Sequence, residues 1–352
     1  MNDIFDVIVI GAGQSGLACG YYLRKTKLNF LLLDANTTCG GAWANNWDKL
    51  QLFSAASHSS LPGWQMPTKK NEYPTKKEVI SYLCQYENRY SLPIKRTVNI
   101  KNVNYRDQLF ELEANNGEIY KAKTIIAATG TQSSPYIPKI KGKEIFKGQQ
   151  LHSSSYKNPN IYKDKSVLVV GEGNSAAQIL AQVSKVTSVF WAVKNKPAFL
   201  PANVDGKDLF DQATAKYKAK KEGKEYNSKN YNLNSIVMVP NVKEAYERNV
   251  YKEYNTIAGF SENHVIWQDG TSTKIDVVIW ATGFNFTTNY LRNLVSVNPN
   301  GKIETIGTSA KQQSGLWLVG FGQWTGYASA TLIGVGRSAR KTIKEIQDFL
   351  NS

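Results

Sequence analysis

Two glycine-rich runs are the part of this sequence whose residue types and spacing best suit chemistry: GAGQSG at 11–16 and GEGNSA at 171–176. Each run follows a short apolar stretch and precedes a helical pattern. In such a turn the first glycine permits a tight bend and the second lets a pyrophosphate approach the backbone. The third lets the helix pack closely on the strand. Two such fingerprints predict that the chain holds two dinucleotides and passes electrons between them.

The residue that ends the next strand after each fingerprint distinguishes the two nucleotides. Asp34 lies 21 residues after Gly13, the spacing at which a carboxylate accepts a hydrogen bond from a ribose hydroxyl. Lys194 lies 21 residues after Gly173 and Lys196 follows, so the second site carries cations, which favour a 2′-phosphate. We therefore expect NADPH at the second fingerprint, with NADH also accepted. FAD is expected at the first, as the hydride acceptor.

The elements that position these residues repeat along the chain. We expect strands at 5–10, 29–34, 166–170 and 188–193, and helices at 14–26, 75–90 and 174–184, the second helix with a capping box. Hairpins are expected at Asn116-Gly117 and Asp269-Gly270. Each half then ends a strand in Ala-Thr-Gly, so the architecture is duplicated. A strand at 316–320 and a helix at about 328–350 return the chain to the first domain.

This order predicts an α/β protein with two Rossmann-like dinucleotide-binding domains, the second inserted in the first. The FAD-binding domain is expected at 1–145 and 275–352, and the NAD(P)H-binding domain at 150–274. Residues 203–262 fit neither core. Helix-like stretches near 208–221 and 241–250 predict a helical excursion near the substrate site, and an ordered surface insertion without such a role is the alternative.

Composition limits the class of protein. The chain has 352 residues, of which 41% are hydrophobic, enough for two domain cores. We find no apolar run near the roughly 18 residues of a membrane helix, and no secretory signal. The net charge of +15 suits anionic cofactors, and no nucleic-acid motif accompanies it. Three isolated cysteines (Cys19, Cys39 and Cys84) predict reduced thiols in a cytoplasmic protein, and no metal-ligand spacing is present.

A third motif lies between the fingerprints, Phe146-x-Gly148-x-x-x-His152-x-x-x-Tyr156. Further motifs are GGAW at 40–43, the two Ala-Thr-Gly strand ends and WTGYASATLIG at 324–334. With these motifs, which span nearly the whole sequence, the chain resembles the small bacterial flavin-containing monooxygenases. These are class B flavoprotein monooxygenases related to the Baeyer–Villiger enzymes. The resemblance implies the FAD/NAD(P)-binding fold of the glutathione and thioredoxin reductases.

The resemblance also implies which residues contact the cofactors, and it implies positioning roles for His152 and Tyr156 on the connection between the domains. The residues expected at FAD are Gly11, Gly13, Gln14, Ser15, Gly16, Asp34, Gly41, Trp43, Val98, Ala128, Thr129, Gly130, Gly322 and Thr331. Those expected at NADPH are Gly171, Gly173, Asn174, Ser175, Ala176, Lys194 and Lys196. No metal site is expected.

The reaction that the resemblance implies begins when NADPH reduces FAD. The reduced flavin then reacts with the co-substrate O₂ and forms a C4a-(hydro)peroxyflavin, which oxygenates a small sulfide, amine or ketone. This sequence departs from the family at 52–57 (LFSAAS), which lacks the asparagine that many members place near the flavin. It also lacks the arginine of the Baeyer–Villiger enzymes, and Gln323 replaces a frequent aspartate. We therefore expect release of hydrogen peroxide to compete with oxygenation.

Two other functions stay open. An NADPH-dependent flavin reductase or oxidase of the thioredoxin-reductase type usually needs a CxxC pair, which is absent, although relatives without the pair occur. A non-catalytic binder linked to metal handling would need ligand spacing that the sequence does not show. The expected partner is a small-molecule substrate rather than nucleic acid or a membrane. A homodimer is the expected assembly, because dimers are common in this architecture.

Overall fold

The chain forms two compact units in the computed structural model, which describes residues 4–67, 72–201, 204, 215, 219, 222–224, 235–252 and 254–352. Unit 1 comprises Met1–Ala44, Ala55–Ser134 and Asn285–Ser352, and unit 2 comprises Asn45–Ser54 and Pro135–Phe284. The boundaries expected near 145 and 275 both lie inside unit 2. The segment Asn45–Ser54, expected in the first domain, belongs to unit 2 instead.

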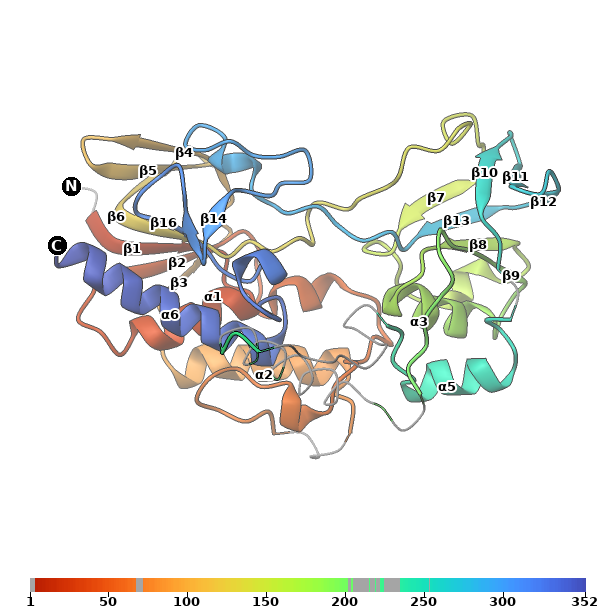
Figure 1. Ribbon diagram of the computed structural model, residues 1–352, viewed down its shortest axis with the longest axis horizontal. Helices are drawn as coiled ribbons and strands as arrows, with labels where there is room; N and C mark the ends of the chain where they lie inside the picture. Colours follow the sequence, from red (N-terminus) through yellow and green to blue (C-terminus); the bar gives the residue numbers. More distant parts are fainter. Residues whose placement is uncertain are drawn as a thin grey trace. The chain divides into compact units, whose positions relative to one another are not determined.

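A parallel sheet in the order β16-β6-β1-β2-β3 forms the core of unit 1 (Figure 1). The carboxyl ends of these strands lie along one edge. The chain passes from β1 to β2 on one side and later returns to β6 on the other, so a switch point lies between β1 and β6, where ligands bind in such folds. The strands are β1 (Ile4–Ile10), β2 (Phe30–Asp34), β3 (Ile94–Arg96), β6 (Ile119–Ala127) and β16 (Leu316–Leu318).

Helices and four antiparallel strands that extend the same sheet complete unit 1. α1 (Gln14–Leu23) packs against α6 (Leu332–Leu350), and the two run side by side in Figure 1. α2 (Lys76–Arg89) begins with the expected capping box of Thr75 and Glu78. The hairpin expected at Asn116-Gly117 joins β5 to β6, with Gly117 at φ +86°. The remaining elements are β4 (Ile100–Arg106), β5 (Leu109–Ala114), β14 (Thr305–Ile306), β15 (Ser309–Ala310), η1 (Gly41–Asn45), η2 (Ala56–His58), η4 (Asn289–Leu291) and η5 (Gln323–Thr325).

Unit 2 is built on a smaller parallel sheet in the order β7-β13-β8-β9. Its strands are β7 (Gln149–His152), β8 (Val167–Val170), β9 (Val189–Ala192) and β13 (Val277–Trp280). α3 (Asn174–Val183) follows β8 and packs on α5 (Pro240–Glu247), and η3 (Pro159–Tyr162) precedes β8. An antiparallel sheet of β10 (Ile257–Phe260), β11 (His264–Trp267) and β12 (Ser272–Lys274) carries the hairpin expected at Asp269-Gly270.

The expected duplication is confirmed strand by strand. The order β6-β1-β2 in unit 1 corresponds to β13-β8-β9 in unit 2. In each case the fingerprint follows the central strand, an Ala-Thr-Gly run follows the strand on one side, and the discriminating residue follows or ends the strand on the other side. Every residue of β8 and β13 is buried. Both strands are apolar throughout, because parallel strands covered on both faces need apolar residues at every position.

The segment Asn45–Ser54 is attached to unit 2 by hydrogen bonds and one aromatic contact. The Asp48 amide donates to the Lys157 carbonyl at 3.1 Å, and the Lys157 ammonium donates to the Asn45 carbonyl at 2.6 Å. Trp47 is buried edge-on against Tyr156, with ring centroids 6.2 Å apart. Burial of this aromatic side chain stabilises the contact. The sequence of the segment shows no regular pattern that would predict it.

The helical excursion is described only in part. α5 confirms the helix expected near 241–250, whereas the helix expected at 208–221 lies largely outside the described residues. None of the described helices has the length and apolar character needed to span a membrane.

Two of the three cysteines are bonded to each other, so the expectation of three reduced thiols is wrong for them. Cys39 precedes Gly40, Cys84 lies on α2, and their Cα atoms are 5.3 Å apart. They are separated by 45 residues, and no local spacing marks such a pair. Cys19 is buried and free. The disulfide removes cysteine usage as an argument for a reducing compartment.

Candidate functional site

The first fingerprint brings three backbone segments into contact at the carboxyl end of β1. Gly11 has φ +103°, and a Cβ there would lie 2.7 Å from the Ala128 carbonyl oxygen. A Cβ on Gly16 would lie 1.9 Å from the Gly11 carbonyl oxygen. Gly13 is the N-cap of α1 and no side chain caps the helix. The first amides of α1 are therefore available to an anion such as a pyrophosphate.

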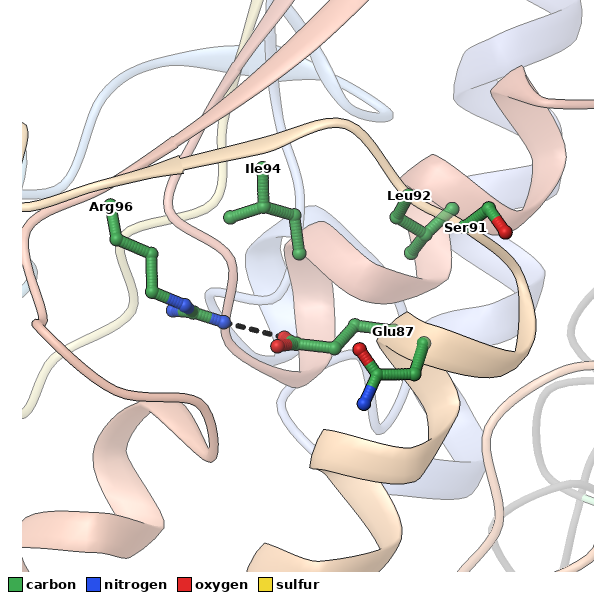
Figure 2. Close-up of a pocket in the computed structure, with 6 residues that line it drawn as sticks. Glu87, Ser91, Leu92, Ile94 and Arg96 are labelled. Atoms are coloured by element: carbon green, nitrogen blue, oxygen red, sulfur yellow. Dashed lines mark hydrogen bonds and ion pairs between the residues drawn. The ribbon is translucent and has the colours of Figure 1, made fainter.

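Asp34, at the end of β2, is buried and held in place by a cation. Its carboxylate accepts from the Arg96 guanidinium at 2.5 Å, and from both the backbone amide and the side-chain amide of Asn36. The other guanidinium nitrogen donates to Glu87 at 2.5 Å, as Figure 2 shows. The Val98 amide donates to the Asp34 carbonyl at 2.9 Å, which places Val98 at the same edge. Asp34 retains acceptor positions for a ribose hydroxyl.

The Arg96–Glu87 pair lines a pocket of about 450 Å³ at the end of α2 (Figure 2). The pocket is open and polar, and its lining residues are Glu87, Asn88, Ser91, Leu92, Ile94 and Arg96. The Arg96 guanidinium pairs with two carboxylates, those of Asp34 and Glu87, so the lining of the pocket offers no unpaired cation to an anionic ligand. The sequence did not reveal Arg96, because neither its positive charge nor its position far along the chain from the first fingerprint indicates a nucleotide-binding residue.

The loop before η1 packs directly on the first fingerprint. A Cβ on Gly41 would lie 2.7 Å from the Gly13 Cα, so two backbones touch here. Trp43 donates from Nε1 to the Gln14 side-chain carbonyl at 3.1 Å, and Gln14 donates to the Ala330 carbonyl at 2.7 Å. Thr331 caps α6 by accepting from the Gly334 amide. Gln14 thus joins the Trp43 loop to the start of α6 beside the fingerprint.

The ends of β6 and β16 supply the remaining residues expected at FAD. The Thr129 hydroxyl donates to the Thr287 carbonyl, and Gly130 has φ +64°. Gly322 has φ +83°, and a Cβ added to either Gly130 or Gly322 would have no described atom within 4 Å. Ser15 is buried against Gly320, where a Cβ would lie 1.9 Å from its hydroxyl. Unit 1 therefore gathers every residue expected at FAD around one edge of its sheet.

The second fingerprint repeats the backbone geometry of the first. Gly171 has φ +139°, and a Cβ there would lie 2.3 Å from the Ala281 carbonyl oxygen. Gly173 is the N-cap of α3 without a side-chain cap, and a Cβ there would have no described atom within 4 Å. Ala176, at the third position, is fully buried, and Ser175 lies in the first turn. The amides at the start of α3 are again available to an anion.

Asn174 and Glu172 have partners that the sequence did not reveal. The Asn174 side chain donates to the Ser235 carbonyl at 3.1 Å and accepts from the Val237 amide at 2.9 Å, so it fixes the segment before α5. The Glu172 carboxylate accepts from the Lys194 and Asn195 backbone amides at 3.2 and 2.8 Å. It also accepts from the Asn195 side chain at 3.0 Å.

The segment after β9 lies beside a negative charge, from Glu172, and carries positive charges, from two lysines. Burial alone would raise the pKa of Glu172, but the hydrogen bonds from Asn195 and Lys194 lower it below the usual range, so the carboxylate is ionised. Lys194 and Lys196 are exposed beside it. A nucleotide ribose bound at this edge would meet an anion as well as the expected cations.

His152 and Tyr156 are buried within unit 2 and hydrogen bonded. His152 Nδ1 lies 3.1 Å from the Ser154 amide and Nε2 lies 2.9 Å from the Gly283 carbonyl, which assigns the proton to Nε2. Burial lowers the pKa of His152, so the ring is neutral. Tyr156 donates to Gln182 and stacks on Tyr162. Burial raises the pKa of Tyr156, so it stays protonated. Both side chains have structural partners that suit a positioning role.

Both fingerprints fit a dinucleotide by a geometric test. Gly13 and Gly173 have ordinary φ values of −74° and −107°. A Cβ on Gly173 would have no described atom within 4 Å, and a Cβ on Gly13 would meet the Gly41 Cα at 3.9 Å, an ordinary van der Waals contact. A glycine at each place therefore leaves room for a ligand rather than relieving backbone strain. Within the described parts of the chain, no three His, Cys, Asp or Glu residues are grouped as a metal site.

Comparisons with known proteins agree with this geometry. Residues 8–200 match the family model described as pyridine nucleotide-disulphide oxidoreductase. A solved flavin-containing monooxygenase from Stenotrophomonas maltophilia is 40% identical, with a TM-score of 0.90 and 99% of each chain covered. The uncharacterized oxidoreductase CzcO of Bacillus velezensis is 32% identical over 349 residues, which is 97% of this chain and 99% of that protein.

A more distant structure, OTEMO in complex with FAD and NADP, shares the fold at 15% identity and a TM-score of 0.68, covering 100% of this chain and 87% of that one. The two fingerprints, the duplicated sheets and the full-length likeness at 40% identity lead to one conclusion. The chain belongs to the pyridine nucleotide-disulphide oxidoreductase family and, within it, to the flavin-containing monooxygenases, which are FAD-dependent oxidoreductases.

Proposed function

We propose that this protein is an NADPH-dependent flavin monooxygenase that transfers one oxygen atom of O₂ to a small sulfide, amine or ketone. One observation carries the proposal: two units of one chain each present a helix N-terminus that begins at a glycine without a side-chain cap, beside a discriminating strand end. A single such site would serve a one-nucleotide protein. Two sites with different strand ends suit a hydride donor and a hydride acceptor.

Unit 1 holds FAD in this proposal, and its own residues bind and orient the cofactor. The α1 amides after Gly13 receive the pyrophosphate, and Asp34, oriented by Arg96, accepts from the adenosine ribose. Gly130 and Gly322 leave the backbone accessible along the same edge, and Gly41 packs on Gly13 of the fingerprint. Bound FAD supplies the chemistry: it accepts hydride and, once reduced, reacts with O₂ through the C4a-(hydro)peroxyflavin that the family likeness implies.

Unit 2 holds NADPH, with the pyrophosphate on the α3 amides and the 2′-phosphate near Lys194 and Lys196. NADPH provides two electrons as hydride, O₂ accepts them, one oxygen atom enters the substrate and the other leaves as water. His152 and Tyr156 position the segments they join and take no part in proton transfer, since their polar atoms are already bound. We further propose a cytoplasmic homodimer that acts on a small molecule, without nucleic acid or membrane partners.

The test follows the FAD-loaded enzyme, reduced with NADPH in the absence of oxygen, as air is admitted in a stopped-flow spectrophotometer. A transient flavin–oxygen adduct, and a substrate product formed in proportion to NADPH, would support the proposal. Direct return to oxidised flavin, with one hydrogen peroxide per NADPH and no oxygenated product from any sulfide, amine or ketone, would contradict it and identify an oxidase.

The second candidate is an NADPH-dependent flavin reductase of the thioredoxin-reductase type, and the bonded pair Cys39–Cys84 in unit 1 favours it. Cys39 lies two residues before Gly41, which packs on Gly13 of the first fingerprint. If the pair carried electrons, NADPH consumption without oxygen would need a disulfide substrate and would disappear in the Cys84→Ser variant. Both activities are compared per bound FAD, and unchanged aerobic turnover per FAD in that variant would favour the monooxygenase.

A further inference from the structure

Glu172 is the one residue of the two fingerprints whose charge the nucleotide-binding pattern does not explain. It stands between Gly171 and Gly173, where the first fingerprint has Ala12. A carboxylate next to a pyrophosphate would repel it. In this protein the side chain instead reaches the segment after β9 and accepts three hydrogen bonds there, two from the backbone amides of Lys194 and Asn195 and one from the Asn195 side chain.

The segment after β9 is the position where a ribose-binding acid usually stands in this fold. β8 and β9 pair in parallel with Val170 opposite Ala192, so Gly171 and Val193 leave the sheet at the same edge. The Gly171 amide donates to the Ala192 carbonyl at 2.9 Å, which fixes this alignment. The fingerprint therefore places a carboxylate at an edge where the strand itself ends in Lys194 and supplies no acid.

We propose that Glu172 is a specificity-determining residue that weakens binding of the 2′-phosphate of NADPH while leaving the 2′-hydroxyl of NADH unaffected. This inference rests on the proposed nucleotide site at the α3 N-terminus. Lys194 and Lys196 attract the phosphate dianion and Glu172 opposes them. A neutral ribose hydroxyl meets no such repulsion and finds an acceptor. The balance brings the affinities for the two nucleotides closer together than the lysines alone would.

The test measures binding of ADP-ribose and of 2′-phospho-ADP-ribose to the FAD-loaded enzyme by isothermal titration calorimetry. These ligands lack nicotinamide, so the readout does not depend on flavin reduction or oxygen chemistry. For Glu172→Gln we expect the preference for the 2′-phosphorylated ligand to rise by about tenfold, with ADP-ribose affinity changed by less than about threefold. Glu172→Asp keeps the charge and is expected to keep the wild-type preference.

The matched control is Glu262→Gln. Glu262 is an exposed acid of the same unit, between β10 and β11, that pairs with Lys147. Its removal changes the net charge equally and should leave the preference unchanged.

An equal loss of both ligands in Glu172→Gln would overturn the inference, because it would reduce Glu172 to a support for residues 194–195. An unchanged preference would overturn it as well. If Glu172→Gln does not fold, a tenfold change of preference in Glu172→Asp would overturn it by showing that geometry rather than charge decides. If the wild-type enzyme binds neither ligand, the proposed nucleotide site itself is wrong.

Discussion

The two fingerprints share a backbone and differ in the charges around it. Gly11 lies against Ala128 as Gly171 lies against Ala281, and α1 and α3 both begin at a glycine without a side-chain cap. Unit 1 ends its second strand with a buried acid held by Arg96. Unit 2 follows its second strand with an exposed lysine and brings in an acid from the fingerprint. The shared part is what any pyrophosphate needs, and the differing part is what distinguishes one ribose from another.

The two strand ends also differ in burial: the residue at the end of β2 is buried and held rigidly, whereas the residues after β9 are exposed. Asp34 is buried in a network with Arg96, Asn36 and Glu87, which fixes one carboxylate geometry. After β9, Lys194, Asn195 and Lys196 are all exposed, and Glu172 accepts hydrogen bonds from the backbone amides of Lys194 and Asn195. A cofactor that stays bound suits the first arrangement, and a nucleotide that exchanges in each cycle suits the second.

The largest effect is expected where the two fingerprints differ at their third position. Gly16→Ala would place a Cβ 1.9 Å from the Gly11 carbonyl oxygen, whereas unit 2 already accommodates Ala176. We expect Gly16→Ala to cost about 3 kcal/mol of stability and to release FAD. The reverse change in unit 2, Ala176→Gly, should cost about 1 kcal/mol. Thermal unfolding and flavin content measure both. Equal stability of the two variants would show that the close approach in unit 1 is not needed.

The disulfide provides the next largest effect, because it joins α2 to the loop before Gly41 in unit 1 only, as far as the described residues go. We expect Cys84→Ser to lower the stability of unit 1 by about 2 kcal/mol and to weaken FAD retention. A reductant should act in the same way on the wild-type protein and have no effect on Cys84→Ser. Chemical unfolding with and without reductant checks this. A wild-type protein that is insensitive to reductant would count against the bond.

The smallest effect is a pH dependence in unit 2. The pKa of His152 is lowered in the folded state by burial, so the unfolded chain binds a proton more readily, near pH 6.5. The stability that neutral His152 contributes is complete above that pH and declines as the pH falls towards its native pKa. We expect His152→Gln to reduce this slope. Thermal midpoints between about pH 7 and pH 5 supply the measurement.

The sequence predicted those features of the fold that depend on the spacing of nearby residues. The glycine positions, the capping box of α2, both hairpins and the duplicated strand order follow from patterns within a few residues, and the structure confirms each. Asp34 and Lys194 could be placed because their distance from the fingerprint is set by one helix and one strand. Side-chain packing then decided how each strand end is charged.

Contacts between distant residues could not be predicted. Cys39 and Cys84 meet only because α2 packs beside the loop before η1, and the sequence shows no spacing for that pair. Arg96 reaches Asp34 because β3 pairs with β2 in parallel, with Arg96 opposite Asp34. The segment Asn45–Ser54 joins unit 2 through Trp47 and Tyr156, a tertiary contact without periodicity. The sequence also did not reveal the partners of Glu172 in the segment after β9.

The central claim is that each fingerprint holds its own nucleotide, and nucleotide binding to the variants Gly13→Ala and Gly173→Ala tests it most directly. Both glycines have ordinary φ values. An added Cβ would meet nothing within 4 Å at Gly173 and only an ordinary van der Waals contact with the Gly41 Cα at Gly13, so an alanine should fold normally and occupy the place of the ligand. We predict that Gly13→Ala loses FAD and still binds NADP⁺, and that Gly173→Ala keeps FAD and binds NADP⁺ at least about tenfold more weakly. The account would be contradicted if either variant lost both nucleotides. It would also be contradicted if both variants kept both nucleotides.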